Sequence, residues 1–576
     1  MVKKSDNIHR KFAESEIGTV KKGWKGRIKV ALVYPNTYHV GMSNLGFHAV
    51  YRLINAIDDI VCERSFLPEG ESTATPKTIE SGKSLSGFDI IAFSVSYEND
   101  YPHILSILGN AGIPLQARDR NPPHPLVMAG GVACFLNPEP ISRFIDCFLI
   151  GEAEPMLPRF LNLYDPDEPR DSCLKALARE VPGIYVPACY KAEYDENERL
   201  DRFEPICDVP KRIERVFVEE LSGVSTCSAI ITPHTTFAGT FLIEVARGCP
   251  HGCRFCSAGF VYRPPRFRPL SLLEKNLKNG LSLTSKIGLV GAAVSDHPEI
   301  SELCKKVDHE KIRISFSSLR VDALTRELIS VLGQSNVKTA TIAPDGGSQR
   351  MRNIINKNIS EQEILDACEA LVENGIPNLK LYFMVGLPTE TTEDVEAIVT
   401  LCKRIKHRFL KSSRIRKKIG EITVSLNCFV PKPSTPFQWS AMDDAQTLRG
   451  KIKRVKEGLR RVANIRVHSD LPRWAQVQGL LSRGDRKVGH ILALAHENKG
   501  NWAKTLKASP INPDYYVLRE RPADELFPWD FIDHGIERSF LFEEYQKALK
   551  EMPSPPCPMK SCSLCGVCMN QPEKRT

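Results

Sequence analysis

The stretch of sequence that decides the fold lies near the middle of the chain and reads Glu244-Val245-Ala246-Arg247-Gly248-Cys249-Pro250-His251-Gly252-Cys253-Arg254-Phe255-Cys256. Its cysteines have the spacing C-x3-C-x2-C and follow an apolar run, residues 241–246, that predicts a buried strand. Three thiolates on one short loop can each bind one iron of a 4Fe–4S cluster. The fourth iron has no cysteine in this loop, so it is left free to bind a small molecule.

Zinc is the alternative for these cysteines. A structural zinc ion takes four ligands, usually from two separate short motifs. Only three cysteines are close together here, although His251 could supply a fourth ligand. The three could also be buried thiols without a metal.

Strand and helix signals alternate on the C-terminal side of the loop, with helical stretches such as residues 360–374 and 392–405. The predicted strands are residues 241–246, 287–294, 312–318, 337–342, 379–385 and 421–430. Parallel strands with crossover helices indicate a partial (β/α)6 barrel. Such barrels place their chemistry at the carboxyl ends of the strands.

Short polar turns follow these strands. They read Val290-Gly291-Ala292-Ala293, Ser317-Ser318-Leu319-Arg320, Ala343-Pro344-Asp345-Gly346-Gly347-Ser348, Tyr382-Phe383-Met384-Val385-Gly386-Leu387-Pro388-Thr389-Glu390 and Phe429-Val430-Pro431-Lys432-Pro433. In this order, and after the cysteine loop, residues 240–435 resemble the radical S-adenosylmethionine (SAM) enzymes. The resemblance implies that the free iron chelates SAM and that an electron from the cluster cleaves it, which yields a 5′-deoxyadenosyl radical.

The resemblance also implies a set of site residues. The cluster ligands would be Cys249, Cys253 and Cys256, and the SAM-binding residues would be Phe255, Gly291, Ala292, Ser317, Arg320, Asp345, Ser348, Met384 and Gly386. The glutamate that the family places after the second strand is missing, so contact with the SAM amino group would fall to backbone carbonyls or to Ser295 and Asp296. No catalytic acid or base can be assigned.

The first 180 residues also alternate between strand and helix signals, which predicts a doubly wound, Rossmann-like sheet. The predicted strands are residues 27–35, 88–96, 125–131 and 144–152, and residues 45–57 form an amphipathic stretch. Such a domain before a radical SAM barrel resembles the cobalamin-binding domain of many of these enzymes. The resemblance implies that Ser94, Ser96, Gly130 and Gly131 line the site for the cobalamin nucleotide tail, with glycine allowing close backbone approach.

The loop after the first strand departs from that family. Cobalamin domains that ligate cobalt carry Asp-x-His-x-x-Gly there, whereas this loop reads Pro35-Asn36-Thr37-Tyr38-His39-Val40-Gly41-Met42. No aspartate precedes His39, so we expect this histidine to be a loop or core residue and any corrin to lack a histidine ligand. Retention and loss of cobalamin both remain open.

A second cysteine cluster lies near the end of the chain, where Cys557, Cys562, Cys565 and Cys568 fall within twelve residues. The C-x2-C-x2-C run is typical of a ferredoxin loop. We expect a second Fe–S cluster, with zinc or redox-active thiols as the alternatives.

Composition is that of an ordinary globular protein, with 42% hydrophobic and 26% charged residues. No run approaches the ~18 apolar residues of a membrane span, and the N-terminus shows no secretory signal, so a cytoplasmic protein without membrane contact is expected. The net charge is +9, and residues 403–418 contain nine Lys or Arg and no acid. This run, like a second between Arg449 and Arg461, is either a solvated face or a patch for RNA or another polyanion.

The chain of 576 residues is too long for one core and divides into four predicted parts. These are a cobalamin-binding-like domain (1–180), a connecting segment (181–235), a radical SAM core (236–470) and a helical region with the cysteine tail (471–576). The leading interpretation is a cobalamin-dependent methyltransferase that takes its electron from a partner such as flavodoxin or ferredoxin. The rivals are an RNA- or protein-modifying radical SAM enzyme without cobalamin, and a non-catalytic Fe–S or zinc protein. The sequence names no substrate.

Overall fold

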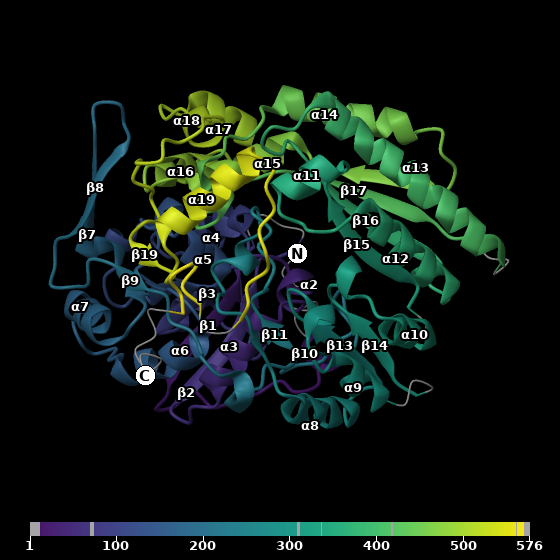
Figure 1. Cartoon of the computed structure of the whole chain (residues 1–576). Coiled ribbons are helices and arrows are strands. Elements are labelled where there is room, and N and C mark those ends of the chain that lie inside the picture. The colour runs from purple at the N-terminus through teal and green to yellow at the C-terminus, as the bar shows by residue number, and fades with distance from the viewer. Residues whose placement is uncertain are drawn as a thin grey trace.

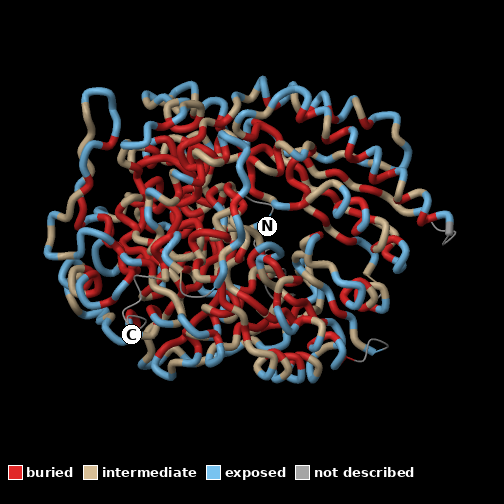
Figure 2. Tube along the Cα trace, viewed as in Figure 1, coloured by how far each residue is buried: buried red, intermediate tan, exposed pale blue. Residues whose placement is uncertain are grey.

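The protein has three parts that lie against one another: an N-terminal sheet, a second set of parallel strands and a group of C-terminal helices (Figure 1). The computed structural model describes residues 12–69, 74–307, 311–335, 337–415, 419–559 and 562–568. Buried backbone runs through all three parts (Figure 2).

The N-terminal sheet has the strand order β2-β1-β3-β4-β5-β6. Its strands are β1 (Ile28–Tyr34), β2 (Ile60–Phe66), β3 (Ile90–Ser94), β4 (Leu126–Gly130), β5 (Cys147–Leu149) and β6 (Ile184–Tyr185). Its helices are α2 (Tyr38–Gly41), α3 (Leu45–Asn55), α4 (Tyr101–Asn110), α5 (Val132–Leu136), α6 (Ala153–Leu163) and α7 (Arg170–Glu180). All pairs are parallel except β5 with β6. The strand order reverses between β1 and β3, the position at which doubly wound sheets bind ligands.

Strand β2 was not predicted, because its sequence contains adjacent charged residues, Glu63 and Arg64. The structure buries all seven of its residues. Arg64 lies 2.6 Å from a carboxylate oxygen of Glu16 and 2.6 Å from one of Glu80. Paired charges of this kind can be buried in a strand, and no local periodicity shows that they are paired.

The segment after the N-terminal sheet holds a two-stranded antiparallel sheet and a short strand, namely β7 (Tyr190–Tyr194), β8 (Leu200–Pro205) and β9 (Ile213–Glu214). Strand β9 pairs with β19 (Ile532–Asp533), far along the chain. Strand β6 at residues 184–185 belongs to the N-terminal sheet although it lies beyond residue 180.

The second set of parallel strands contains the six that the sequence predicts, and they form two sheets. One has the order β10-β13-β14 and the other β15-β16-β17-β18. The strands are β10 (Phe241–Glu244), β13 (Lys286–Val290), β14 (Arg313–Phe316), β15 (Thr339–Asp345), β16 (Asn378–Val385), β17 (Ile422–Cys428) and β18 (Ile465–Ser469). The helices are α8 (Leu270–Leu281), α9 (Ile300–Lys305), α10 (Arg326–Gln334), α11 (Gln349–Ile354), α12 (Glu361–Glu373), α13 (Thr392–Ile415) and α14 (Ala445–Leu459). Within the described ranges β14 and β15 do not pair, so the barrel is partial.

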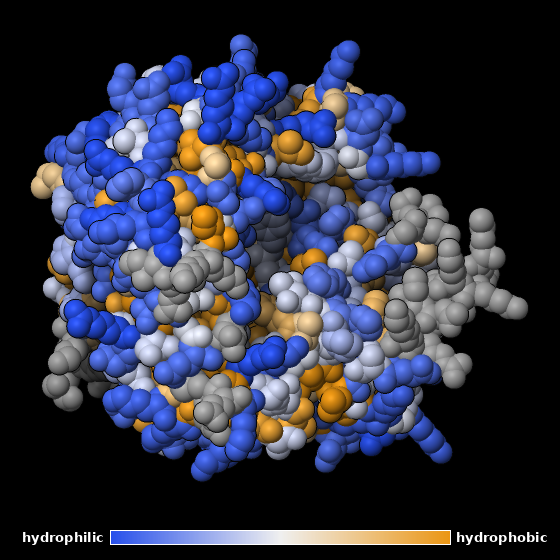
Figure 3. Space-filling view, turned by 90° about the vertical axis from the view of Figure 1, so that its right-hand side faces the viewer, coloured by the Kyte–Doolittle hydropathy of each residue, from blue (hydrophilic) through white to orange (hydrophobic). Residues whose placement is uncertain are grey.

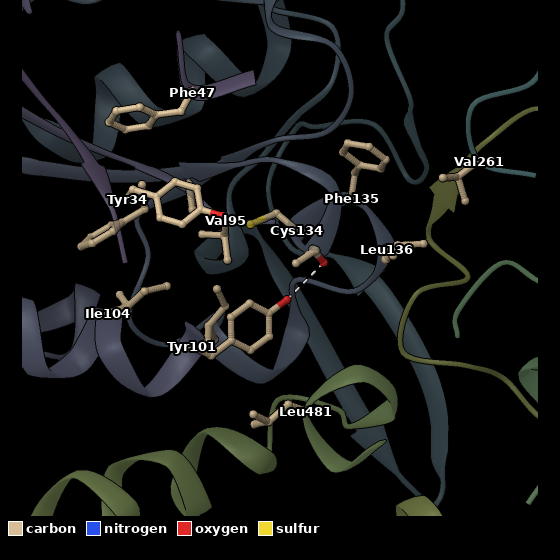
Figure 4. Close-up of a cluster of buried hydrophobic side chains, with 14 of the residues drawn as sticks. Tyr34, Phe47, Val95, Tyr101, Ile104, Cys134, Phe135, Leu136, Val261 and Leu481 are labelled. Carbon is tan, nitrogen blue, oxygen red and sulfur yellow. Dashed lines mark hydrogen bonds between the residues drawn. The ribbon is translucent and has the colours of Figure 1, made fainter. Parts of the chain in front are cut away.

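The C-terminal helices cover the other two parts. They are α15 (Pro472–Arg483), α16 (Val488–Glu497), α17 (Trp502–Ala508), α18 (Asp514–Val517) and α19 (Arg538–Leu549). Val261 from the second part and Leu481 from α15 belong to the same buried hydrophobic cluster as Tyr101, Phe135 and Leu136 of the N-terminal part (Figure 4). One hydrophobic core therefore joins the three parts and holds their facing loops at fixed positions.

Candidate functional site

The cysteine loop begins where a small antiparallel pair, β11 (Ala246–Arg247) with β12 (Arg266–Phe267), follows β10. Gly248 has φ +79°, and a Cβ there would lie 2.7 Å from the carbonyl oxygen of Tyr262. Only glycine tolerates this turn, which sends the chain from the sheet edge into the loop. Gly248 is therefore required by the backbone turn, whereas Cys249 is required as a ligand.

The three thiols of the loop lie near one another and are partly or fully buried. Burial, and then the nearby Cys253 and Cys256, raise the pKa of the Cys249 thiol to about 12. Burial and then Cys253 raise the pKa of Cys256 to about 11. The free loop therefore keeps the Cys249 and Cys256 thiols protonated at neutral pH, and metal must displace these protons when it binds.

The metal-binding side chains at the loop do not suit a single zinc ion. Among the described residues, the one group of three or more donors within 4.8 Å of one another is Cys249, His251 and Asp296. His251 Nε2 lies 2.7 Å from Asp296 Oδ2. This group lacks the fourth ligand of a structural zinc site and leaves out Cys253 and Cys256. A cubane instead binds each thiolate to a separate iron, so its thiolates stand farther apart than ligands of one ion. The three cysteines fit the cubane better.

Two cations that lie beside Cys253 come from different loops. Arg320 follows β14, and its Nη1 is 4.0 Å from the Cys253 sulfur. The Nη2 of Arg320 donates to the carbonyl of Lys357 at 3.1 Å, and the Lys357 ammonium is 2.6 Å from Asp345 at the end of β15. The strand-end motifs predicted Arg320 and Asp345 but not Lys357, which lies in a loop outside all of these motifs.

Ser317 and Ser348, which were predicted to bind SAM, both hydrogen-bond to other residues of the protein. Ser317 donates to the carbonyl of Gly291 at 3.1 Å, which joins the ends of β14 and β13. Ser348 caps α11 by accepting from the Met351 amide at 3.0 Å and donates to Asp394 at 2.6 Å, so its hydroxyl is engaged within the protein.

The residues proposed for the SAM amino group also have protein partners. Asp296 pairs with His251, and Ser295 accepts a hydrogen bond from the Arg320 amide at 3.0 Å. The Gly291 carbonyl after β13 is engaged as well, since it accepts from the Ser317 and Ser318 hydroxyls at 3.1 and 2.9 Å.

Two residues expected near the adenine share one apolar environment. Phe255 and Met384 are both half-buried against the same hydrophobic cluster, which includes Phe260 and Leu387. Gly386, two residues after Met384, has φ +83° and donates its amide to Glu390 at 2.7 Å. The cysteine loop and the end of β16 thus meet on one apolar surface.

A cavity of about 510 Å³ separates the N-terminal sheet from the cysteine-loop side of the barrel. Ser94, Ser96, Gly130 and Gly131 line it from the sheet, and Gly291 and Ala292 line it from the barrel. The sequence pattern predicted the first four of these residues for cobalamin and the last two for SAM, and one cavity brings all six together. The remaining wall of this cavity is mostly apolar. The face of the molecule on the right-hand side of Figure 1 is also hollowed near its centre, with apolar residues around the hollow (Figure 3).

His39 lies away from the lining of this cavity. It is exposed, and its Nε2 is 3.1 Å from the hydroxyl of Thr236. His39 belongs to the short helix α2 (Tyr38–Gly41) and is exposed, so the expectation of a loop or core residue was wrong about its setting.

A buried ion-pair network joins the cavity wall to the cysteine loop. Arg247, next to Gly248, lies 2.7 Å from Glu152, 2.5 Å from Glu154 and 3.0 Å from Glu244. Arg266 lies 2.7 Å from the other oxygen of Glu152. Burial alone would raise the pKa of the Glu152 carboxyl, but the charges of Arg247 and Arg266 outweigh it and hold this pKa below its usual value.

Replacing Arg247 with Met should destabilise the protein by about 3–5 kcal/mol, because the buried Glu152 and the half-buried Glu154 and Glu244 lose a shared partner. Urea unfolding at pH 7 measures this loss. Since the folded pKa of Glu152 is lowered, its contribution is present above the ordinary carboxyl pKa and is lost as the pH falls through the lowered value. The wild type and the variant should therefore converge in stability at acid pH.

Arg212→Met is the matched control, because Arg212 forms a mostly exposed pair with Asp533 at 3.4 Å. Exposed pairs contribute little, so this variant should unfold close to the wild type. Equal midpoints for the two variants would contradict the role assigned to Arg247.

The second cysteine cluster lies within the described residues, with Cys565 buried and Cys557, Cys562 and Cys568 half-buried. Burial and the nearby Cys562, Cys565 and Cys557 raise the pKa of the Cys568 thiol. The four described cysteines thus lie near one another, although no three of their sulfur atoms all lie within 4.8 Å of one another.

The basic run on α13 is partly neutralised. Arg404 pairs with Glu361, and Arg408 pairs with Glu369 on the neighbouring α12. Lys406 is buried, and burial lowers its pKa. The basic run of the sequence extends to Arg416, Lys417 and Lys418, which lie outside the described residues. The described part favours a solvated helix face over a polyanion site.

A partial barrel with a three-cysteine loop at its strand ends, behind a doubly wound sheet, defines the class of radical SAM proteins. The family model of the radical SAM superfamily matches residues 243–402, and the model of radical SAM proteins, N-terminal, matches residues 46–187. The chain therefore belongs to the radical SAM superfamily, whose enzymes use a 4Fe–4S cluster and SAM.

Three similar proteins give the extent of this relationship. An uncharacterized protein of Methanocaldococcus jannaschii is 31% identical over 80% of this chain and 90% of its own length. An uncharacterized methyltransferase of Pyrococcus horikoshii is 25% identical over 28% of this chain and 37% of its own length. The structure of the radical S-adenosylmethionine methyltransferase TsrM from Kitasatospora setae covers 69% of this chain and 72% of its own, with 12% identity and a TM-score of 0.46. In the described residues, helices of a length and apolarity that would span a membrane are absent.

Proposed function

We propose that this radical SAM enzyme holds its cluster on Cys249, Cys253 and Cys256, binds cobalamin in the cavity between sheet and barrel, and transfers a methyl group to a substrate. The observation that carries the proposal is the shared cavity: Gly130 and Gly131 line it on one side, and Gly291 and Ala292 line it on the other. A cofactor on the sheet would therefore face the place expected for SAM.

The cavity fits part of a corrin by two features. The Gly130–Gly131 turn exposes backbone, and the Cβ position of Gly131 is already filled by the carbonyl oxygen of Val95 at 2.4 Å, so the wall admits no side chain there. Ser94 and Ser96 add hydroxyls at the end of β3, next to the reversal in strand order where such sheets bind ligands. A cluster on the cysteine loop, together with SAM, would supply a radical initiator. Cobalamin bound in the cavity would supply a methyl carrier.

The residues of the chain have separate roles in this proposal. Arg320 and Lys357 place positive charge beside Cys253 and stabilise the negative charge of a thiolate-bound cluster. Phe255 and Met384 offer an apolar surface to the adenine. Arg247 fixes the cysteine loop to the sheet that would hold the corrin.

Methyl transfer is also supported by the Pyrococcus horikoshii relative, whose name is that of a methyltransferase. Anaerobic purification, reconstitution with iron, sulfide and hydroxocobalamin, and quantification of all three test the proposal. We expect iron and sulfide for a full cluster at the loop and about one corrin per chain. A protein that retains the cluster but no corrin would favour radical modification of RNA or protein without cobalamin.

A further inference from the structure

The chain segment before the second cysteine cluster lies directly on the first cysteine loop. The Cys557 amide donates to the carbonyl of Pro250 at 2.7 Å. The Ser554 amide donates to Asn356 Oδ1 at 2.7 Å, and Asn358 Nδ2 donates to the Ser554 carbonyl at 2.8 Å. We call residues 552–557 the C-terminal strap. The strap brings the first cysteine of the second cluster to the residue that follows Cys249.

Arg254 fastens the strap from inside the first loop. It lies between Cys253 and Phe255 and is fully buried. Its Nη2 donates to the carbonyl of Met552 at 2.7 Å and lies 3.1 Å from Glu544 of α19, while Nη1 donates to the carbonyl of Ile354 at 3.0 Å. A buried guanidinium with this many partners fixes the geometry of all of them. The loop and the strap are therefore one rigid unit.

One side of the second cysteine cluster is hydrogen-bonded to the start of α19, and the other side is exposed to solvent. The Glu537 amide, at the start of α19, donates to the carbonyl of buried Cys565 at 3.0 Å. Leu564, next to it, is 64% exposed, and Met559 is 46% exposed. Exposed apolar side chains around a cofactor site are suited to docking a protein partner.

We infer that Cys557, Cys562, Cys565 and Cys568 hold an Fe–S cluster that relays electrons to the radical cluster through the Cys557–Pro250 contact. This rests on the proposed function, because the radical cluster on Cys249, Cys253 and Cys256 is the electron acceptor. A flavodoxin- or ferredoxin-type protein is oxidised by one electron at the open side. A cluster held by Cys557, Cys562, Cys565 and Cys568 would accept that electron and pass it to a cluster held by Cys249, Cys253 and Cys256. No covalent bond forms or breaks in the relay.

Four cysteine ligands suit this role, because a fully ligated cluster leaves no iron open to SAM or substrate. The hydrogen bond from Cys557 to Pro250 links the two ligand sets by few covalent bonds, since Pro250 adjoins Cys249. Zinc at the same four cysteines would hold the strap equally well but could not carry an electron.

The test compares the wild type with the variant Cys562→Ala/Cys568→Ala, both reconstituted anaerobically with iron and sulfide. Freeze-quench electron paramagnetic resonance follows reduction of the radical cluster, identified as the signal that SAM perturbs. One series uses dithionite, which is small enough to reach the radical cluster directly, and the other uses reduced flavodoxin. We expect similar rates with dithionite and a rate at least about tenfold lower with flavodoxin for the variant.

Two further variants separate relay from folding. Cys207→Ala removes a half-buried thiol outside both clusters and should match the wild type with both reductants. Asn358→Ala loosens the strap and keeps all seven cluster cysteines, so it should retain full iron and slow reduction by flavodoxin alone.

The outcomes are distinguishable. Equal flavodoxin rates in the wild type and the double variant, or zinc in place of iron at the second cluster, would overturn the relay and leave the proposed function standing. A wild type that lacks any SAM-sensitive cluster signal would remove the acceptor and overturn both.

Discussion

Replacing Cys249, Cys253 and Cys256 together with Ala should abolish the cleavage of SAM to 5′-deoxyadenosine. The loop would lose all three thiolates that can hold a cubane, and no other described donor group at this position offers a replacement. The rate should fall to the level without enzyme, a loss of several orders of magnitude. Chromatographic detection of 5′-deoxyadenosine under reducing, anaerobic conditions measures it, with iron and sulfide counted in the same samples.

The second cysteine cluster provides an internal control for this experiment. Its four cysteines are intact in the triple variant, so the iron bound there should remain. Cys304→Ala, which removes a buried thiol from α9, should cleave SAM at the wild-type rate. Undiminished cleavage by the triple variant would show that the radical cluster lies elsewhere.

Filling the cavity at Gly130 should abolish corrin retention. A Cβ at Gly130 would meet only ordinary contacts with Leu149, at 3.7 Å, so the backbone accepts a side chain. A tryptophan there would occupy a large share of the roughly 510 Å³ cavity. We therefore expect Gly130→Trp to raise the Kd for hydroxocobalamin at least about tenfold, as read from the visible spectrum after removal of free corrin.

His39→Ala is the matched control for corrin binding. His39 is exposed and contacts Thr236, away from the cavity lining, so its loss should leave the spectrum nearly unchanged. Loss of corrin from this variant alone would identify His39 as a cobalt ligand after all. Gly130→Ala, with its small side chain, should retain corrin and show that the tryptophan acts by filling space.

Gly131 is a less suitable position for the same test. Its φ is +105°, and a Cβ would lie 2.4 Å from the Val95 carbonyl oxygen. Any side chain at Gly131 strains the backbone, so its replacement would disturb the fold whether or not a corrin binds. Gly130 is therefore the more informative of the two positions for the corrin-binding test.

The sequence predicted those elements that local patterns define. Continuous apolar runs give buried parallel strands, so the six barrel strands and four strands of the N-terminal sheet were found near their observed positions. Strand β2 was missed because a charged residue such as Arg64 does not look like a buried one in the sequence. Its pairing with Glu16 and Glu80, which allows the burial, is a tertiary contact. The boundaries of the four parts stay predictions, although β6 shows that the first sheet reaches residue 185.

For the site, the sequence by itself identified the two cysteine clusters and predicted which strand ends surround the first of them. Ligand spacing within a loop is a local property, and parallel strands must end at one edge. Only the tertiary structure decided which of these ends share a cavity, that Lys357 stands beside Cys253, and that the strap from Cys557 rests on Pro250. These contacts join segments separated by about a hundred to three hundred residues. They depend on how the three parts pack over a common core, and no local sequence pattern records that packing.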